Sequence, residues 1–289
     1  MISVYNPTPV KQGGKNFRTE VFYMDLKLTN KVAVVTGGGA GIGLAVALKL
    51  SEEGAGVVVA DLNIEAARHA AAQIESQGGR ALALACDATK EDEVEALFQK
   101  SLGSFGAVDI LVNNVGGGAG IALVVKSDVE SWDQTIEINL KSAYLCCRAA
   151  ARVMIPRKEG RIINLSSVSG RQGEQLLSAY CAAKFGIMGL TQTLAKELAR
   201  HNITVNAVCP GYVFTPGWEK LAQAVKEIQP AYAQMSLRDI FDARVREVTP
   251  LRRPQEPSEI ASLVAYLASW EARSITGQAI GIDGGITMR

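Results

Sequence analysis

Short apolar runs alternate with longer amphipathic stretches along most of the chain. The runs are rich in valine, isoleucine, alanine and leucine, and they fall at 32–35, 56–60, 81–85, 109–112, 161–165, 204–208 and 278–282. Most show no polar alternation, which is typical of parallel strands with helices on both faces. Helical periodicity lies between them at 42–53, 64–77, 90–102, 129–155, 179–200 and 257–270. This order predicts an α/β fold: a single Rossmann-type, doubly wound parallel sheet of about seven strands with helices on both faces.

Two segments depart from the alternation. Residues 1–24 are polar and aperiodic, and we interpret them as a flexible N-terminal arm before a catalytic domain at 25–289. Residues 212–250 form a helical insertion bounded by prolines, with scattered apolar residues such as Trp218 and Phe241. The insertion follows a predicted strand at the edge where such sheets bind ligands. We therefore expect a substrate lid whose apolar residues pack only when the site is filled.

The first predicted strand leads directly into a glycine-rich segment. Its sequence is Thr36-Gly37-Gly38-Gly39-Ala40-Gly41-Ile42-Gly43, followed by a predicted helix. Bare glycines let the backbone approach a pyrophosphate, and the N-terminus of a helix offers free N–H groups and a favourable dipole. The strand, turn and helix together predict a dinucleotide phosphate site.

An acidic residue, Asp61, ends the second predicted strand, 20 residues after Gly41. A carboxylate at this position can accept hydrogen bonds from the adenosine ribose, and it repels a 2′-phosphate. Neither the glycine segment nor residues 62–63 contain a Lys or Arg that could bind such a phosphate. The sequence therefore predicts NAD rather than NADP as the cofactor.

A tyrosine and a lysine four residues apart open the predicted helix 179–200. Tyr180 and Lys184 share a helix face at this spacing. A nearby ammonium stabilises phenolate and lowers the pKa of a phenol from its usual value of about 10. Ser167 lies thirteen residues earlier, at the carboxyl end of a predicted strand, and Asn139 lies inside the predicted helix 129–155. This set predicts acid–base chemistry at the ligand-binding edge of the sheet.

These segments together resemble the short-chain dehydrogenase/reductase family over residues 25–289. The resemblance rests on motifs in one order: TGGGAGIG at 36–43, NNVG at 113–116, Asn139, Ser167, YCAAK at 180–184, PGYVFT at 210–215 and ITGQAIGIDGG at 275–285. It implies that Tyr180 is the general acid/base and that Lys184 holds the nicotinamide ribose. It also implies that Ser167 binds the substrate oxygen and that Asn139 holds a water that relays the proton.

The resemblance implies the dinucleotide contacts as well. Asp87 would bind the adenine amino group, Asn113 and Gly116 would flank the adenosine and ribose, and Thr215 would contact the carboxamide. The full set of implied cofactor-binding residues is Gly37, Gly41, Ile42, Gly43, Asp61, Asp87, Asn113, Gly116, Tyr180, Lys184, Pro210, Gly211, Val213 and Thr215.

Composition and charge exclude several other classes of protein. The formal net charge is +1, so neither nucleic acid nor an anionic membrane surface is an expected partner. No apolar run reaches the roughly 18 residues that a membrane helix needs. The five cysteines lack a CxxC spacing, and the two histidines are far apart, so we expect no metal site and a cytoplasmic protein. The family resemblance also implies a homotetramer whose subunits contact one another through the helices 129–155 and 179–200.

The expected function is hydride transfer between NAD(H) and a secondary alcohol or ketone. We expect the substrate to be a small alcohol, diol, polyol or sugar, partly because the insertion at 212–250 loosely resembles that of polyol and diol dehydrogenases. The alternative is a reductase of 3-oxoacyl thioesters of the acyl-carrier-protein type, which usually needs NADPH. A non-catalytic dinucleotide-binding protein is a remote alternative, because the Asn139, Ser167, Tyr180 and Lys184 set is complete.

Overall fold

One parallel sheet organises the computed structural model, which describes residues 25–118 and 121–288. Its seven strands lie in the order β3-β2-β1-β4-β5-β6-β7. The strands are β1 (Val32–Thr36), β2 (Gly56–Asp61), β3 (Arg80–Ala85), β4 (Ile110–Asn113), β5 (Gly160–Leu165), β6 (Ile203–Pro210) and β7 (Ala279–Ile282). The predicted seven-stranded, doubly wound fold is confirmed, while the predicted arm at 1–24 lies outside the described residues.

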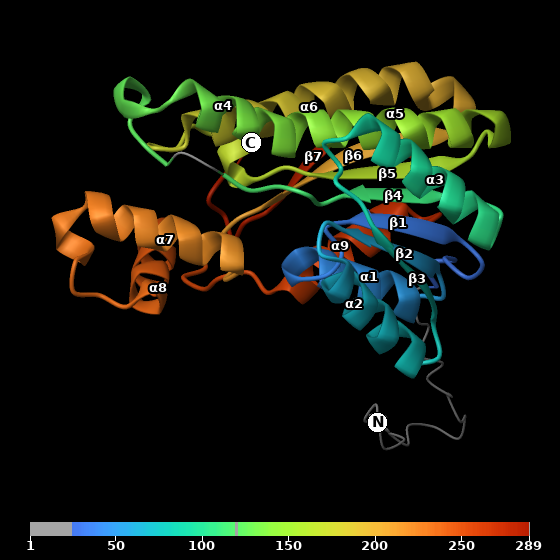
Figure 1. The fold of residues 1–289 in the computed structure, drawn as a ribbon, viewed down its shortest axis with the longest axis horizontal. Helices are drawn as coiled ribbons and strands as arrows, with labels where there is room; N and C mark the ends of the chain where they lie inside the picture. The colour runs from blue at the N-terminus through green and yellow to red at the C-terminus, as the bar shows by residue number, and fades with distance from the viewer. Residues whose placement is uncertain (1–24, 119–120, 289) are drawn as a thin grey trace, which may run out of the picture.

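Helices cover both faces of the sheet, as Figure 1 shows. The α-helices of the described residues are α1 (Gly41–Glu52), α2 (Ile64–Ser76), α3 (Glu91–Phe105), α4 (Val129–Ile136), α5 (Ser142–Met154), α6 (Ser178–Leu198), α7 (Pro216–Ile228), α8 (Leu237–Val248) and α9 (Pro257–Ala268). The helices α1, α2 and α9 pack on one face, and α3, α5 and α6 pack on the other. Each face of the sheet has its own hydrophobic core, and strand β1 contributes to both. Ala33 and Val35 point into the core under α1, α2 and α9, and Val32 and Val34 point into the core under α3, α5 and α6. This double burial explains why the strands read as continuous apolar runs.

The predicted helix 129–155 is interrupted in the structure. A π-helical turn at Glu137–Lys141 separates α4 from α5. A π turn adds one residue to the helical repeat, so it changes which side chains point inward, and such turns are frequent at functional sites. The residue that it directs into the protein is Asn139, which is completely buried.

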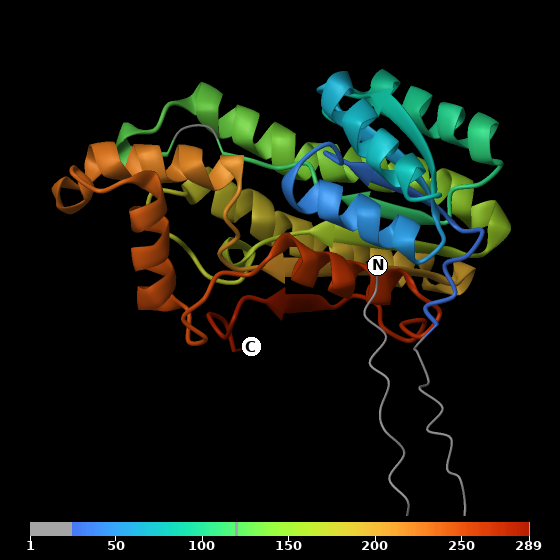
Figure 2. The same cartoon turned by 90° about the horizontal axis from the view of Figure 1, so that it is seen from below.

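The insertion at 212–250 forms its own small core. Helix α8 buries Ile240 and Phe241 completely. The Phe241 ring lies 4.7 Å from the ring of Trp218 and 5.0 Å from that of Phe214, in edge-on geometry. The scattered apolar residues of this segment thus meet in one cluster, which Phe214 and Tyr212 outside the helices complete. Figures 1 and 2 show α7 and α8 standing apart from the helices that cover the sheet, beyond the end of β6.

Candidate active site

The glycine segment after β1 is a tight turn that admits no side chain at its centre. Gly37 and Gly41 have positive φ angles of 60° and 56°, a region that favours glycine. A Cβ atom on Gly43 would lie 2.0 Å from the carbonyl oxygen of Gly37. The backbone at the start of α1 is therefore bare, and it fits the close approach of a pyrophosphate.

Asn114 fixes the shape of this turn, and our sequence analysis did not single it out. Its Nδ2 atom donates to the carbonyl oxygens of Thr36 and Gly37, at 3.1 and 2.9 Å. The backbone N–H of Asn114 also donates to Oγ1 of Thr36 at 3.1 Å. These bonds tie the end of β4 to the end of β1. The NNVG motif contained the signal, but its second asparagine holds the glycine turn.

Asp61 lies beside the glycine turn, as its position in the sequence predicts. Its Oδ2 atom accepts a hydrogen bond from the backbone N–H of Gly39 at 2.9 Å, and Oδ1 accepts one from Asn63 at 3.0 Å. The carboxylate thus joins the end of β2 to the turn that would carry the phosphates. This is the position from which a carboxylate meets an adenosine ribose.

Two other residues expected at the adenosine end have structural partners. The Oδ1 atom of Asp87 accepts hydrogen bonds from the backbone and the hydroxyl of Thr89, at 2.9 and 2.7 Å. The Asn113 side chain is buried and donates to Oδ1 of Asn164 at 2.8 Å, on the side of α5. A dinucleotide contact of Asn113 would therefore come from its backbone.

The segment after β6 returns to the glycine turn. Thr215 caps α7 through its hydroxyl, and its methyl group would lie 3.7 Å from a Cβ atom on Gly41. Val213 is buried in the core below, and Ile42 packs partly buried against the same core. Gly211 faces Asp283, whose Cα would lie 2.8 Å from a Cβ atom there. The Thr215 side chain thus lies beside Gly41 of the phosphate turn, while Gly211 packs against Asp283, and a cofactor contact of Pro210-Gly211 stays a prediction.

Lys184 is the centre of the candidate catalytic set. It is 3% exposed, and its Nζ atom donates to the carbonyl oxygen of Leu165 at 2.9 Å and lies 5.5 Å from the centre of the Tyr180 ring. A Cβ atom on Gly116 would meet Lys184 Nζ at 3.0 Å and Asn139 Oδ1 at 2.9 Å. Lys184, Asn139 and Gly116 are therefore brought together, as the sequence predicts. Burial lowers the pKa of Lys184 to about 8.

Asn139 holds the loop that follows β4. Its Oδ1 atom accepts a hydrogen bond from the N–H of Gly117 at 3.2 Å, and its Nδ2 atom donates to the carbonyl oxygen of Gly117 and to that of Thr135. The π turn places this amide next to Lys184. In the described structure Asn139 therefore positions the active-site loop, and the water relay remains a prediction.

Ser167 and Tyr180 face each other across the end of β5. Burial raises the pKa of Tyr180, and a hydrogen bond with Ser167 opposes this shift. The sequence analysis expected Lys184 to lower this pKa, but burial is the larger effect here. The neighbouring Ser166 is buried, and its hydroxyl donates to the carbonyl oxygen of Lys184 at 2.9 Å. Ser166 is thus a structural link; the Ser167 hydroxyl accepts a hydrogen bond from the backbone N–H of Ser169 at 3.1 Å, and its contact with substrate stays a prediction.

The geometry suits proton transfer beside a dinucleotide site, and similarity to known proteins identifies the family. The short chain dehydrogenase family profile matches residues 31–226. The chain belongs to the short-chain dehydrogenase/reductase family. Members of this family are oxidoreductases that use a nicotinamide dinucleotide, and the bare glycine turn fits that group. Among residues 25–118 and 121–288, no group of three or more His, Cys, Asp or Glu side chains is placed to hold a metal ion, and no helix there is long and apolar enough to cross a membrane.

Relatives in this family match nearly the whole chain. A 3-oxoacyl-(acyl-carrier-protein) reductase of Synechocystis sp. is 38% identical over 266 residues, which cover 90% of this chain and 98% of the relative. A reductase of the same name from Thermotoga maritima is 36% identical over 266 residues, covering 91% of this chain and 100% of the relative.

Solved structures in the same family show the same fold. A variant of actinorhodin polyketide ketoreductase with NADPH has a TM-score of 0.83 and 36% identity, and the alignment covers 89% of this chain and 97% of that chain. NAD+-bound xylitol dehydrogenase has a TM-score of 0.85 and 33% identity, and the alignment covers 90% of this chain and 100% of that chain.

The relatives correct the expected substrate class. Several relatives at 36–38% identity over most of the chain are named 3-oxoacyl-(acyl-carrier-protein) reductases. The expectation of a small alcohol, diol, polyol or sugar is therefore wrong, and the alternative is favoured. The candidate catalytic residues could not distinguish the two, because the roles predicted for Asn139, Ser167, Tyr180 and Lys184 suit both reactions. The likeness of the insertion at 212–250 to polyol dehydrogenases misled the sequence analysis.

Proposed function

We propose that the protein reduces 3-oxoacyl thioesters carried by an acyl carrier protein, with NADH as the hydride donor. The observation that supports this most directly is the identity of 36–38% to reductases of that name, over about nine-tenths of the chain. The complete catalytic set at the carboxyl edge of the sheet is consistent with the reaction.

The proposed mechanism assigns one role to each side chain. A reduced nicotinamide dinucleotide held by the glycine turn and Lys184 would supply the hydride to the 3-oxo carbon. Ser167 donates a hydrogen bond to the 3-oxo oxygen, and Tyr180 transfers its phenolic proton to the same oxygen as the alcohol forms. Because burial raises the pKa of Tyr180, the phenol is the form present at neutral pH, which suits reduction. The ammonium of Lys184 stabilises the phenolate that remains.

The direct test is reduction of acetoacetyl-coenzyme A, a soluble 3-oxoacyl thioester, followed by the loss of NADH absorbance. We expect turnover with this probe and a higher kcat/KM when the same acyl group is carried by an acyl carrier protein. Xylitol and butane-2,3-diol with NAD serve as the comparison for the rejected substrate class. Turnover of a diol or polyol without turnover of either thioester would contradict the proposal.

The choice of NADH rests on Asp61. Its carboxylate accepts a hydrogen bond from Gly39 of the phosphate turn, so a 2′-phosphate on the adjacent ribose would meet a negative charge at short range. We expect kcat/KM with NADH to exceed that with NADPH by at least about tenfold, or roughly 1.4 kcal/mol. Asp61→Ala should reduce this ratio, mainly by improving KM for NADPH. A wild-type preference for NADPH would refute the role given to Asp61.

Lys184 should set the alkaline limit of the reaction. Because burial lowers its pKa to about 8, the ammonium is lost as the pH rises through that value. The phenolate then loses its stabilising charge, so kcat/KM for acetoacetyl-coenzyme A should fall by up to about tenfold per pH unit above 8. Lys184→Arg keeps a positive charge and should move this fall to higher pH. A profile that stays flat to pH 10 would contradict this assignment.

The insertion at 212–250 is proposed to act as a lid that moves as one unit. Its aromatic cluster at Trp218, Phe214 and Phe241 holds α7 and α8 together, and Thr215, which caps α7, lies beside Gly41 of the phosphate turn. Closure over bound substrate would exclude water from the reacting atoms. Hydrogen exchange of the backbone of α7 should slow when NADH and a thioester analogue are added together, while exchange in α9 should not change. Equal exchange of α7 in both conditions would show a fixed surface segment.

A further inference from the structure

A cavity lies at the amino edge of the sheet, on the opposite side from Ser167 and Tyr180. Its volume is about 150 Å³, and it opens where β1, β4 and β5 begin. Leu28, Ile110 and Ala268 give it an apolar wall, and the indole of Trp270 lies at its rim, half exposed. The rest of the lining is Gly160 and the charged residues Lys27, Lys31, Asp109, Glu159 and Arg161. Neither the proposed reaction nor the dinucleotide uses this cavity.

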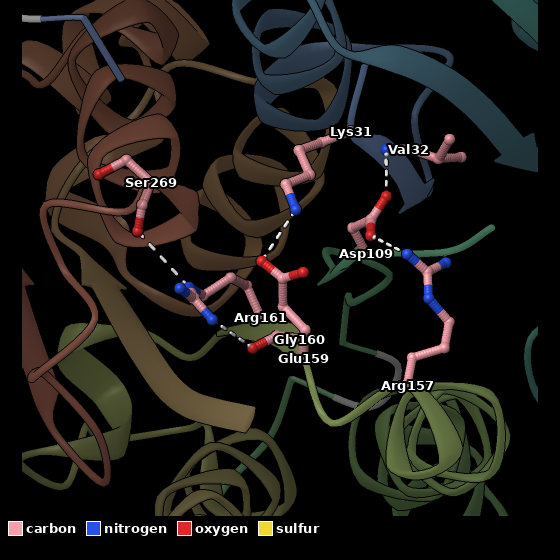
Figure 3. A network of polar contacts seen from close by, with 8 residues as sticks. All are labelled: Lys31, Val32, Asp109, Arg157, Glu159, Gly160, Arg161 and Ser269. Carbon is pink, nitrogen blue, oxygen red and sulfur yellow. Dashed lines mark hydrogen bonds and ion pairs between the residues drawn. The ribbon is translucent and has the colours of Figure 1, made fainter. Parts of the chain in front are cut away.

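Two ion pairs lie around the cavity, as Figure 3 shows: Lys31 with Glu159 and Arg157 with Asp109. The Nζ atom of Lys31 lies 2.8 Å from Oε1 of Glu159. Asp109 is 4% exposed, and it accepts hydrogen bonds from the backbone N–H of Val32 at 2.8 Å and from Arg157 at 2.7 Å. These contacts satisfy both carboxylates that line the cavity.

Arg161 is the exception. It is only 7% exposed, yet its guanidinium donates solely to backbone carbonyl oxygens, to Gly160 at 2.9 Å and to Ser269 at 3.5 Å (Figure 3). Within the part of the chain that the structure describes, no carboxylate lies within ion-pair distance of it; Glu159 acts on its charge from further away, and that carboxylate is bound to Lys31. A buried charge without a direct ion-pair partner is costly. Arg161 therefore presents an unpaired cation to a cavity that has room for an anion.

We propose that this cavity binds a small organic monocarboxylate, with its carboxylate on the guanidinium of Arg161. The planar fork of an arginine matches a carboxylate in geometry and charge. The volume equals that of about five molecules of liquid water, which suits a short-chain acid whose hydrocarbon part packs against Leu28 and Ile110. The nearby carboxylate of Glu159 disfavours a multiply charged anion such as phosphate. The site lies at the start of β5, whose other end leads to Ser167.

The experiment is a calorimetric titration of the full chain with sodium butyrate, with butyramide and inorganic phosphate as matched probes. Butyrate should bind saturably, and butyramide should bind at least about tenfold more weakly because it lacks the charge. Arg161→Gln should remove butyrate binding, with circular dichroism as the check of folding. Glu159→Gln should strengthen butyrate binding, because it removes a repulsive charge from a partly exposed position and leaves Arg161 in place.

Other outcomes would overturn the proposal. These are the absence of saturable butyrate binding, equal binding of butyrate and butyramide, tighter binding of phosphate, or weaker butyrate binding in Glu159→Gln. The butyrate affinity should be the same in the Tyr180→Phe variant as in the wild type. It should also stay unchanged when that variant is saturated with NADH and acetoacetyl-coenzyme A. Competition by the thioester would place butyrate at the catalytic edge instead, and would also refute the assignment.

Discussion

Tyr180→Phe should remove nearly all turnover of acetoacetyl-coenzyme A while the protein still binds NADH. The substitution keeps the aromatic ring 5.5 Å from Lys184 Nζ and deletes only the hydroxyl that supplies the proton. Loss of a positioned general acid lowers the rate by about 10²- to 10⁴-fold. The measurements are kcat under conditions in which chemistry limits, and NADH binding by fluorescence.

The matched control for this variant is Tyr266→Phe. Tyr266 lies on α9, on the opposite face of the sheet from α6, and it packs partly buried against the core. Removing its hydroxyl should leave kcat unchanged. If Tyr180→Phe retained more than about a tenth of the wild-type kcat, a general-acid contribution of the usual size could not be assigned to Tyr180.

Gly43→Ala should weaken dinucleotide binding strongly. A Cβ atom at this position would lie 2.0 Å from the carbonyl oxygen of Gly37 and 2.6 Å from Nδ2 of Asn114. Because both contacts involve the turn itself, the turn must move away from the start of α1. We expect the dissociation constant for NADH to rise by at least about tenfold, and the protein to lose about 1–3 kcal/mol of stability through overpacking.

The control for the glycine substitution is Gly103→Ala. Gly103 lies in α3, and a Cβ atom there meets nothing within 4 Å. Alanine inside a helix is more favourable than glycine by about 0.5–1 kcal/mol, so this variant should melt at or above the wild-type temperature and bind NADH normally. Unchanged NADH binding in Gly43→Ala would refute the close-packed phosphate turn.

The strand ends and the residues they carry were predictable from the sequence because both obey local rules. A buried parallel strand reads as an apolar run, and the turn after β1 needs glycine where φ is positive. The side chains of Ser167, Tyr180 and Lys184 follow such elements at fixed spacings. These parts of the site could therefore be located before the structure was known.

Features that depend on tertiary contacts were less accessible to the sequence analysis. Helical periodicity gave no sign of the π turn at Glu137–Lys141, which places Asn139 against Lys184. The start of α3 illustrates the same limit. This helix begins after Lys90, and the hydroxyl of the preceding Thr89 donates to Asp87 instead of capping it.

The pKa of Tyr180 is a further case in which the surroundings decide. A lysine on the same helix face predicts a lowered value, and burial at the end of β5 outweighs it. The substrate class is harder to predict, because the roles proposed for Asn139, Ser167, Tyr180 and Lys184 concern the reacting carbonyl group and not the rest of the substrate. Only similarity over the whole chain separates these substrates.

The double link between β5 and α6 has a consequence for how this scaffold can be re-engineered. Ser166 Oγ and Lys184 Nζ each bind a backbone carbonyl across that junction, so the acid–base groups are anchored independently of the loops that meet the substrate. Residues 171–177 and 212–250 emerge outside this anchor. Replacing these two segments with those of another family member should therefore give this protein the substrate range of the donor. The acid–base groups would stay in place, so substrate choice and chemistry can be changed separately.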